Sequence, residues 1–284
     1  MAKDSSISLL ANGVWFIETG FAANYLPAIT AYLRGQNIDF HNFKRENPFS
    51  ALALQGDENQ LNEFEKPEQI QIAALAILEV KGAITKEDQF CGPVGTQTLS
   101  NILRGCYSNP QISSVVLKID SGGGEVYAMN LLADTIGERT KPVIAFIDDF
   151  AASAAYGIAS ACDHIVANNN MAWVGSIGCY TTFVDYSKYW EKEGIRVEDI
   201  YADQSTEKNS EYREALKGNF EPMRKITSHF AEDFISRVEN SRGEKLTAKR
   251  DVWATGKMFF APQALKIGLI DEINSFENLI KNLL

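Results

Sequence analysis

From Ile70 onward, the apolar residues of the chain follow strand and helix patterns in alternation. Three mostly apolar runs have the length and composition of buried strands: IQIAALAILEV (70–80), SSVVLKID (113–120) and PVIAFID (142–148). Between the last two, EVYAMNLLADTIGERT places Val126, Met129 and Leu132 on one helical face. This order predicts a β-α-β unit with a parallel sheet, and hence an α/β fold.

Further elements are predicted after the third strand. The segment AASAAYGIASACDHIVA predicts a tightly packed helix that leads into a short strand at His164–Ala167. The later patterns predict an amphipathic helix within 184–194, a strand over 196–201, a long helix over about 212–240, and two short helices separated by Gly268.

Residues 1–69 have a different composition. Apolar residues recur there at helical spacing, namely Tyr25, Leu26, Ile29, Tyr32 and Leu33. The polar stretch QGDENQLNEFEKPEQ follows them and ends at Gln69. We therefore predict a helical N-terminal extension with an acidic linker over residues 1–69, and one catalytic domain over residues 70–284.

Composition and charge narrow the function classes. The chain has 284 residues, of which 45% are hydrophobic. Its net charge is -10 and the sequence contains no run of basic residues, which disfavours nucleic acid as a partner. The N-terminus lacks the features of a secretory signal, and no apolar run reaches the roughly 18 residues of a membrane span. We expect a soluble cytoplasmic protein. The four cysteines form no CxxC pair, so we expect neither a zinc site nor a disulfide framework.

The first candidate for chemistry is a glycine loop. Asp120-Ser121-Gly122-Gly123-Gly124 lies where the strand 113–120 ends and a helix begins. Glycines at such a point allow successive backbone N–H groups to face one anion or oxyanion. A plain strand-to-helix turn explains the same residues, so the loop alone does not establish a function.

The second candidate is Ser153, in the segment Ala151-Ala152-Ser153-Ala154-Ala155. A serine near a helix start and flanked by small residues is open to substrate, and we expect its own N–H and that of Ala154 to face the same space. A helix-capping serine is the ordinary alternative.

A nucleophilic serine needs a base, and none of the three histidines is well placed. His41 lies in the extension, His229 in the long helix, and His164 at the far end of the helix that follows Ser153. A Ser-His-Asp triad is therefore disfavoured. A lysine kept neutral by burial is the other base available near neutral pH. Lys208 follows the strand predicted at 196–201, although its position alone does not prove burial. Four other lysines fit solvated helix faces, namely Lys188, Lys192, Lys217 and Lys225.

With these residues in view, about residues 72–273 resemble the signal peptide peptidase A family of Ser-Lys peptidases, which have the ClpP/crotonase fold of repeated ββα units. Five motifs carry the resemblance in the family's order: LAILEVKGAIT, VVLKIDSGGGE, KPVIAFIDDFAASAAYGIASACDHIVA, WVGSIG and ATGKMFFAPQALKIGLIDEI. The soluble members with a helical N-terminal extension, the capsid-assembly proteases of tailed phages and prophages, are the most similar type.

The resemblance implies roles for particular residues. Ser153 is implied as the nucleophile and Lys208 as the general base. Gly123, Gly124 and the Ala154 amide are implied as oxyanion-hole donors, and Ser176 as the hydroxyl that orients the lysine amine. No cofactor and no metal are implied.

The sequence also departs from the family pattern. Gly122 replaces a proline, Ala154 and Ala155 replace two glycines, and the segment ADQSTEKNSE around Lys208 lacks the family's glycine and is longer by about two residues. The histidine of the ClpP branch is missing from GSIGC, and the serine of AASAAYG argues against acyl-CoA enzymes of the crotonase type.

These observations together predict a serine endopeptidase that uses a Ser-Lys dyad and an acyl-enzyme intermediate. The expected substrate is an extended peptide or protein, and the expected assembly is a ring-like homo-oligomer. Phage head maturation, with capsid or scaffold proteins as partners, and degradation of signal or membrane peptides are the roles that the resemblance suggests. The alternative is a catalytically impaired, peptidase-like assembly scaffold, which the altered segment around Lys208 favours.

Overall fold

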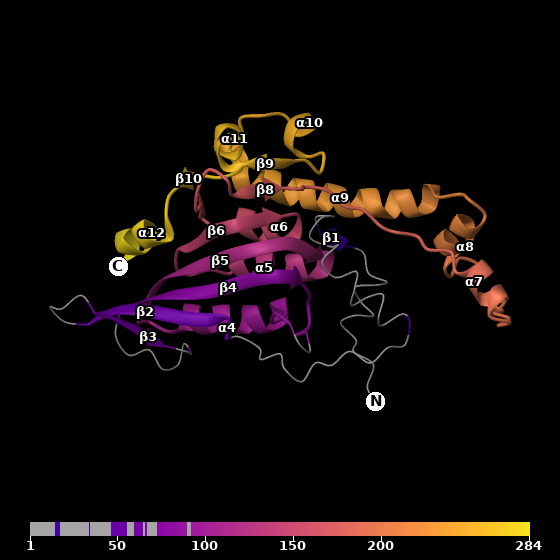
Figure 1. Cartoon of the computed structure of the whole chain (residues 1–284), viewed down its shortest axis with the longest axis horizontal. Coiled ribbons are helices and arrows are strands. Elements are labelled where there is room, and N and C mark those ends of the chain that lie inside the picture. The colour runs from indigo at the N-terminus through magenta and orange to yellow at the C-terminus, as the bar shows by residue number, and fades with distance from the viewer. Residues whose placement is uncertain are drawn as a thin grey trace.

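The structure, a computed structural model, describes residues 15–17, 34, 47–55, 60–64, 66, 73–89 and 92–284 and is built around one large sheet (Figure 1). The strands run in the order β10-β7-β6-β5-β4-β2-β3. Their bounds are β2 (Phe49–Gln55), β3 (Gln60–Phe64), β4 (Ala74–Ile84), β5 (Ile112–Glu125), β6 (Val143–Ala152), β7 (His164–Ala167) and β10 (Glu272–Ile273). β4, β5, β6, β7 and β10 are parallel, and β2 and β3 extend the sheet antiparallel to β4.

Three helices follow the parallel strands and cover one face of the sheet, namely α4 (Thr96–Ser108), α5 (Val126–Gly137) and α6 (Ala154–Ser160). The long helix α9 (Glu221–Arg242) packs against α6. The predicted apolar face of α5 is fully buried at Met129 and Leu132. The parallel strands are apolar along their length because both of their faces are covered. These features confirm the predicted α/β fold with a parallel sheet.

A smaller core lies on the other face of the sheet. α12 (Phe276–Leu283) contributes Leu279 and Ile280 to it, and Ser275 caps the helix by accepting a hydrogen bond from the Asn278 N–H at 3.3 Å. Three strand residues that meet this helix, Leu75, Val116 and Phe146, are also fully buried. The C-terminal helix therefore belongs to the same folded unit as the sheet.

Short elements complete the end of the sheet near α6. They are β8 (Trp173–Gly175), which pairs with β6 and β9, then η3 (Gly243–Lys245), α10 (Arg250–Trp253), β9 (Met258–Phe260) and α11 (Ala261–Ile267). As predicted, Gly268 ends α11, in a left-handed conformation with φ 81°.

Residues 181–220, called the arm below, project from this body. The arm carries α7 (Ser187–Lys192) and α8 (Ser210–Leu216) beyond the N-terminal end of α9, at the right of Figure 1. Two predictions for this region are wrong. Residues 196–201 form no strand, and the long helix predicted over 212–240 is two helices. The break falls at Gly218, whose φ of 84° is left-handed, and the second helix begins at Glu221 with Pro222 in its first turn.

The prediction of a helical extension and linker over residues 1–69 is wrong for the part that the structure describes. β2 and β3 lie within this range and join the main sheet, and β1 (Trp15–Ile17) pairs with β5. Phe49 and Ala51 are buried on either side of the half-exposed Ser50, which is the two-residue period of a strand. The residues predicted to be helical, Tyr25–Leu33, lie outside the described residues.

A buried ion pair ties the C-terminal part of α9 to the loop before β10. Arg242, whose side chain is 1% exposed, donates to both carboxylate oxygens of Asp271 at 2.8 and 2.9 Å. Burial raises the pKa of Asp271, but the hydrogen bonds from Arg242 and Lys245 outweigh this effect and hold the pKa at about 2.

Replacing Asp271 with Asn should lower the free energy of unfolding by about 3 kcal/mol at neutral pH, because it leaves a buried guanidinium without its counter-charge. The folded-state pKa of Asp271 is depressed, so its contribution is complete above about pH 4 and disappears as the pH falls towards 2. Urea unfolding at pH 7 and at pH 3 measures both effects. Glu198→Gln, in the exposed pair with Arg196, is the matched control and should cost less than about 1 kcal/mol. An equal loss in both variants would contradict the prediction.

Candidate active site

Ser153 lies at the sharp turn between β6 and α6. Its φ of 55° and ψ of -121° are unusual for a residue with a side chain, and such strain occurs mostly at functional sites. The Ser153 N–H donates to the Gly175 carbonyl oxygen of β8 at 2.8 Å, and this bond holds the turn against the neighbouring strand. The expectation that this N–H faces the same space as the Ala154 N–H is therefore wrong. The residue is 2% exposed, so its hydroxyl is reached only through a cavity.

That cavity has a volume of about 470 Å³ and brings together two of the predicted site residues, Ser153 and Ser176. Ser176 also has a positive φ, of 53°, and its N–H donates to the Lys257 carbonyl oxygen at 2.8 Å. The other lining residues are Gly178, Cys179, Tyr180, Ala231, Ile235, Ala254, Thr255, Gly256 and Met258. Sequence reasoning missed the contributions of α9 and of the segment before β9, because only the tertiary fold brings them beside Ser153.

The glycine loop reaches this site by strand register. The last pair between β5 and β6 joins Ser121 to Ala151. Gly123 of β5 and Ser153, the first residue after β6, each follow two residues later in the chain. Gly123 has a φ of 104°, and its N–H donates to the Ser121 Oγ at 3.1 Å. The Ser121 hydroxyl in turn donates to the Gly82 carbonyl oxygen at 2.6 Å. Ser121, which sequence reasoning missed, thus anchors the loop. It accepts the hydrogen bond of the Gly123 N–H, which is one of the two predicted glycine donors.

Gly124 is a glycine because of a close backbone approach. A Cβ at this position would lie 1.9 Å from the Ile84 carbonyl oxygen of β4, which is far inside van der Waals contact. Any side chain here must therefore push β5 away from β4 and displace the loop from Ser153.

Gly124→Ala should reduce peptide hydrolysis by roughly 10²- to 10³-fold, the effect of losing one oxyanion donor. Gly137→Ala is the matched control, because a Cβ there meets nothing within 4 Å. Initial rates with a fluorogenic peptide, together with a thermal unfolding curve for each variant, measure the effect. Activity of a folded Gly124→Ala protein equal to that of the control would show that the loop does not contact the reacting group.

Ala154 is the first residue of α6 and is fully buried beside Ser153. Its N–H has no acceptor within the helix, as is general for the first turn. Because the Ala154 N–H is at the start of α6, it remains available to donate to an oxyanion, as predicted for this residue.

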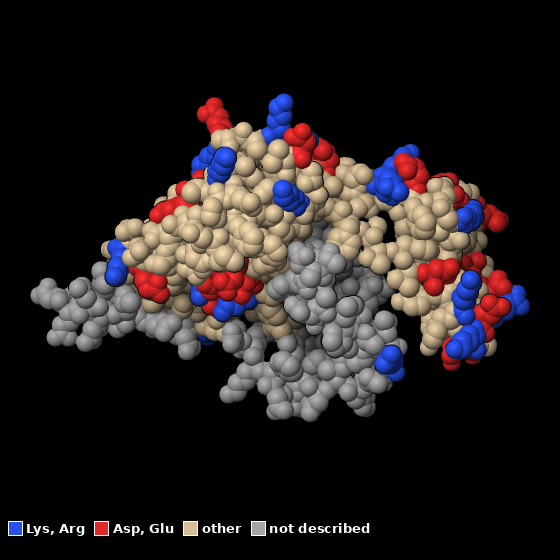
Figure 2. All heavy atoms as spheres, turned by 45° about the horizontal axis from the view of Figure 1, so that its top comes forward, with Lys and Arg blue, Asp and Glu red and all other residues tan. Residues whose placement is uncertain are grey.

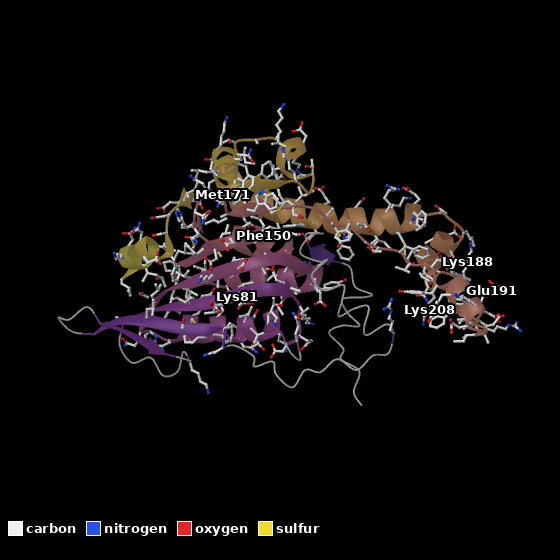
Figure 3. The ribbon with its side chains drawn as sticks, viewed as in Figure 1. Lys81, Phe150, Met171, Lys188, Glu191 and Lys208 are labelled. Atoms are coloured by element: carbon white, nitrogen blue, oxygen red, sulfur yellow. The ribbon has the colours of Figure 1, made fainter. Side chains whose placement is uncertain are left out.

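The predicted base, Lys208, lies elsewhere in the single chain. It is exposed on the arm, in the turn before α8, and is well separated from α6 (Figures 1 and 3). No lysine or histidine is among the described residues that line the cavity of Ser153. His164 lies instead beside Glu272, with its Nε2 3.3 Å from the Glu272 Oε2. Cys179 lines the cavity, but burial raises its pKa to about 11, so it is a thiol and a poor nucleophile near neutral pH.

No group of three or more His, Cys, Asp or Glu side chains gathers in the described part of the chain in a way that could hold a metal ion. No helix among these residues combines the length and hydropathy needed to cross a bilayer.

Parts of the chain are similar in sequence to known proteins. A putative protease of Methanocaldococcus jannaschii is 31% identical over 185 residues, covering 64% of this chain and 59% of that protein. The head-tail preconnector protein GP5 of Enterobacteria phage P21 is 30% identical over 137 residues, covering 46% of this chain and 27% of the phage protein. The chain thus spans less than two thirds of either relative. Among solved structures, a membrane-bound stomatin-specific protease covers 73% of this chain and 82% of its own at 16% identity, with a TM-score of 0.49.

The family model described as peptidase family S49 matches residues 136–284, which is just over half of the chain. The matched range contains Ser153, Ser176 and Lys208 and begins after the glycine loop. The motifs in the sequence and this match indicate the same family. The chain belongs to peptidase family S49.

Proposed function

We propose that the chain is a serine endopeptidase with Ser153 as its nucleophile. The observation that carries this proposal is the strained turn at Ser153, which opens into a cavity shared with Ser176 beside the glycine loop. A serine at a sharp strand-to-helix turn exposes its hydroxyl on the substrate side. Membership of a peptidase family supports the same reaction.

The general base in this proposal is Lys208 of a neighbouring copy of the chain. The cavity of Ser153 has no base among its described lining residues, whereas Lys208 projects from the body on the arm. The turn around Lys208 is ordered: its N–H donates to the Ser205 carbonyl oxygen at 3.2 Å, and the Arg213 guanidinium lies 4.8 Å from the Tyr201 ring centroid. An ordered lysine on a projecting arm can reach the site of another molecule.

The surface of the arm supports this assembly. Ile200 is 94% exposed and Val197 63%, and both lie in the irregular segment between α7 and α8. The exposed apolar and aromatic residues of the arm are Val184, Tyr186, Tyr189, Trp190, Ile195, Val197, Ile200, Tyr212, Leu216 and Phe220. A soluble protein rarely leaves so many neighbouring apolar residues exposed unless another surface covers them. Figure 2 presents the arm as a separate lobe at the right of the molecule, where a second copy has access to it.

The proposed reaction follows from these groups. The lysine amine becomes neutral when the second copy buries it, because burial disfavours the ammonium form. The amine accepts the proton of the Ser153 hydroxyl, and the oxygen attacks a peptide carbonyl carbon. The Ala154 N–H and a glycine-loop N–H stabilise the resulting oxyanion, and Ser176 orients the amine. The lysine then protonates the leaving amine, and water hydrolyses the acyl-enzyme.

We propose an extended peptide as the substrate, bound beside the glycine end of β5. The similarity to a phage head-tail preconnector protein supports capsid or scaffold proteins as the source of that peptide. Homo-oligomerisation is part of the same proposal, because the dyad needs two copies.

A catalytically impaired assembly scaffold is the second candidate. The observation that favours it is the exposure of Lys208 in the single chain. Labelling with a fluorescent fluorophosphonate separates the two functions, since the reagent reacts only with an activated serine. The endopeptidase proposal requires labelling that disappears in Ser153→Ala and falls strongly in Lys208→Ala. Labelling that is absent from the unaltered chain would support the scaffold. Labelling that depends on Ser153 but is the same with and without Lys208 would remove Lys208 as the base.

A further inference from the structure

The N-terminal part of the chain places a strand at the glycine end of β5. β1 runs antiparallel to β5 and lies at the end of β5 beside α6 (Figure 1). Its pairs are Trp15 with Glu125, Phe16 with Gly124, and Ile17 with Gly123. Gly123 and Gly124 belong to the glycine loop and follow the last residue of β5 that pairs with β6.

The register shows which edge of β5 the strand β1 occupies. β4 pairs with Gly123 and Gly124 on one edge of β5. A strand has two edges, so β1 must pair with these glycines on the other edge. That edge is the one along which β6 pairs with β5 up to Ser121. β1 therefore pairs with this edge of β5 just beyond the last residue that pairs with β6.

The same register brings β1 close to Ser153. β6 ends at Ala152 and turns into α6 at Ser153, just as β5 continues to Gly123. Ile17 pairs with Gly123, so its backbone lies along the edge of β5 that β6 leaves after Ala152, where the Ser153 turn begins. An extended peptide that reaches Ser153 by pairing with the glycine loop must occupy this same edge.

We propose that residues 15–17 bind in the place of a substrate strand, so that the chain's own N-terminal segment competes with any added peptide. A segment of the same chain acts at a high effective concentration, and a free peptide must displace it to bind. That β1 pairs with this edge of β5 is a feature of the fold. Only the claim that a substrate peptide binds to the same edge rests on the proposed endopeptidase function.

The test uses the full-length chain with Ser153→Ala, so that binding is measured without hydrolysis. Phe16→Pro together with Ile17→Pro removes two backbone N–H donors and breaks the pairing with β5. Ala11→Pro together with Asn12→Pro is the matched control, with two prolines outside β1. The probe is a fluorescein-labelled peptide with the sequence of residues 11–22, and its affinity is measured by fluorescence polarisation. Hydrogen exchange of the amides of residues 123–125 is measured on the same proteins without peptide.

The proline variant at 16 and 17 should bind the probe about tenfold or more tightly than the control, and its amides at 123–125 should exchange faster. Equal affinity and equal exchange in the two variants, or no binding to either, would overturn the proposal. Casein hydrolysis by the same chains with Ser153 intact tests the proposed function separately. A chain that hydrolyses casein equally well with and without the prolines would leave the endopeptidase in place and remove the competing strand.

Discussion

Ser153→Ala should lower the rate of peptide hydrolysis by a factor of about 10⁴ or more, because it removes the oxygen that forms the acyl-enzyme. The Ala side chain fits the same buried position, so the fold is expected to remain. Rates measured with a fluorogenic peptide, and intact mass after long incubation, give the effect on added substrate and on self-cleavage. Unchanged hydrolysis by Ser153→Ala would remove Ser153 from the mechanism.

Ser153→Gly is the informative companion variant. It is equally inactive, but glycine adopts a φ of 55° without the cost that a side chain adds. Its free energy of unfolding should therefore exceed that of Ser153→Ala by about 1 kcal/mol. A Gly variant less stable than the Ala variant in urea unfolding would show that the turn at Ser153 is not strained.

Lys208→Ala should reduce hydrolysis by roughly 10³- to 10⁴-fold, because the hydroxyl of Ser153 then has no base. Lys208→Arg separates proton transfer from charge. Arginine keeps the positive charge but does not release its proton near neutral pH, so it should be as inactive as alanine. Lys217→Ala is the control, since Lys217 is an exposed lysine of the same arm that pairs with Glu214. Activity restored by arginine would indicate that residue 208 contributes only charge.

The fold of the parallel core could be predicted from the sequence because each of its strands is a continuous apolar run. β4, β5 and β6 overlap the predicted runs, and α5 has the predicted buried face. All three strands continue beyond the predicted ends, and β5 includes the glycines that were predicted to follow it. β2 was missed because alanines fill two of the positions in FSALALQ, which leaves a weak two-residue alternation. The break between α8 and α9 was missed because the apolar spacing continues across Gly218, where only the backbone conformation ends the first helix.

Some residues of the candidate site leave a signal in the sequence, and others do not. Ser153 and Gly124 could be proposed as candidates because small residues near strand ends leave a local signal in the sequence. The anchoring of Gly123 by Ser121 depends on the Gly82 carbonyl oxygen of the neighbouring strand, which no local pattern reveals. The location of Lys208 could not be predicted for a further reason: the arm lies away from the body, and its proposed role depends on contact with another copy.

Mixing two inactive chains tests the shared dyad most directly. Ser153→Ala keeps Lys208, and Lys208→Ala keeps Ser153, so a mixed oligomer can combine both groups at one site. If the dyad forms between copies, an equal mixture that has exchanged subunits should regain about a quarter of the unaltered activity, since about a quarter of the sites then pair an intact serine with an intact lysine. Each variant alone should stay inactive. A mixture that forms mixed oligomers by native mass spectrometry and yet remains as inactive as its components would contradict a dyad shared between copies.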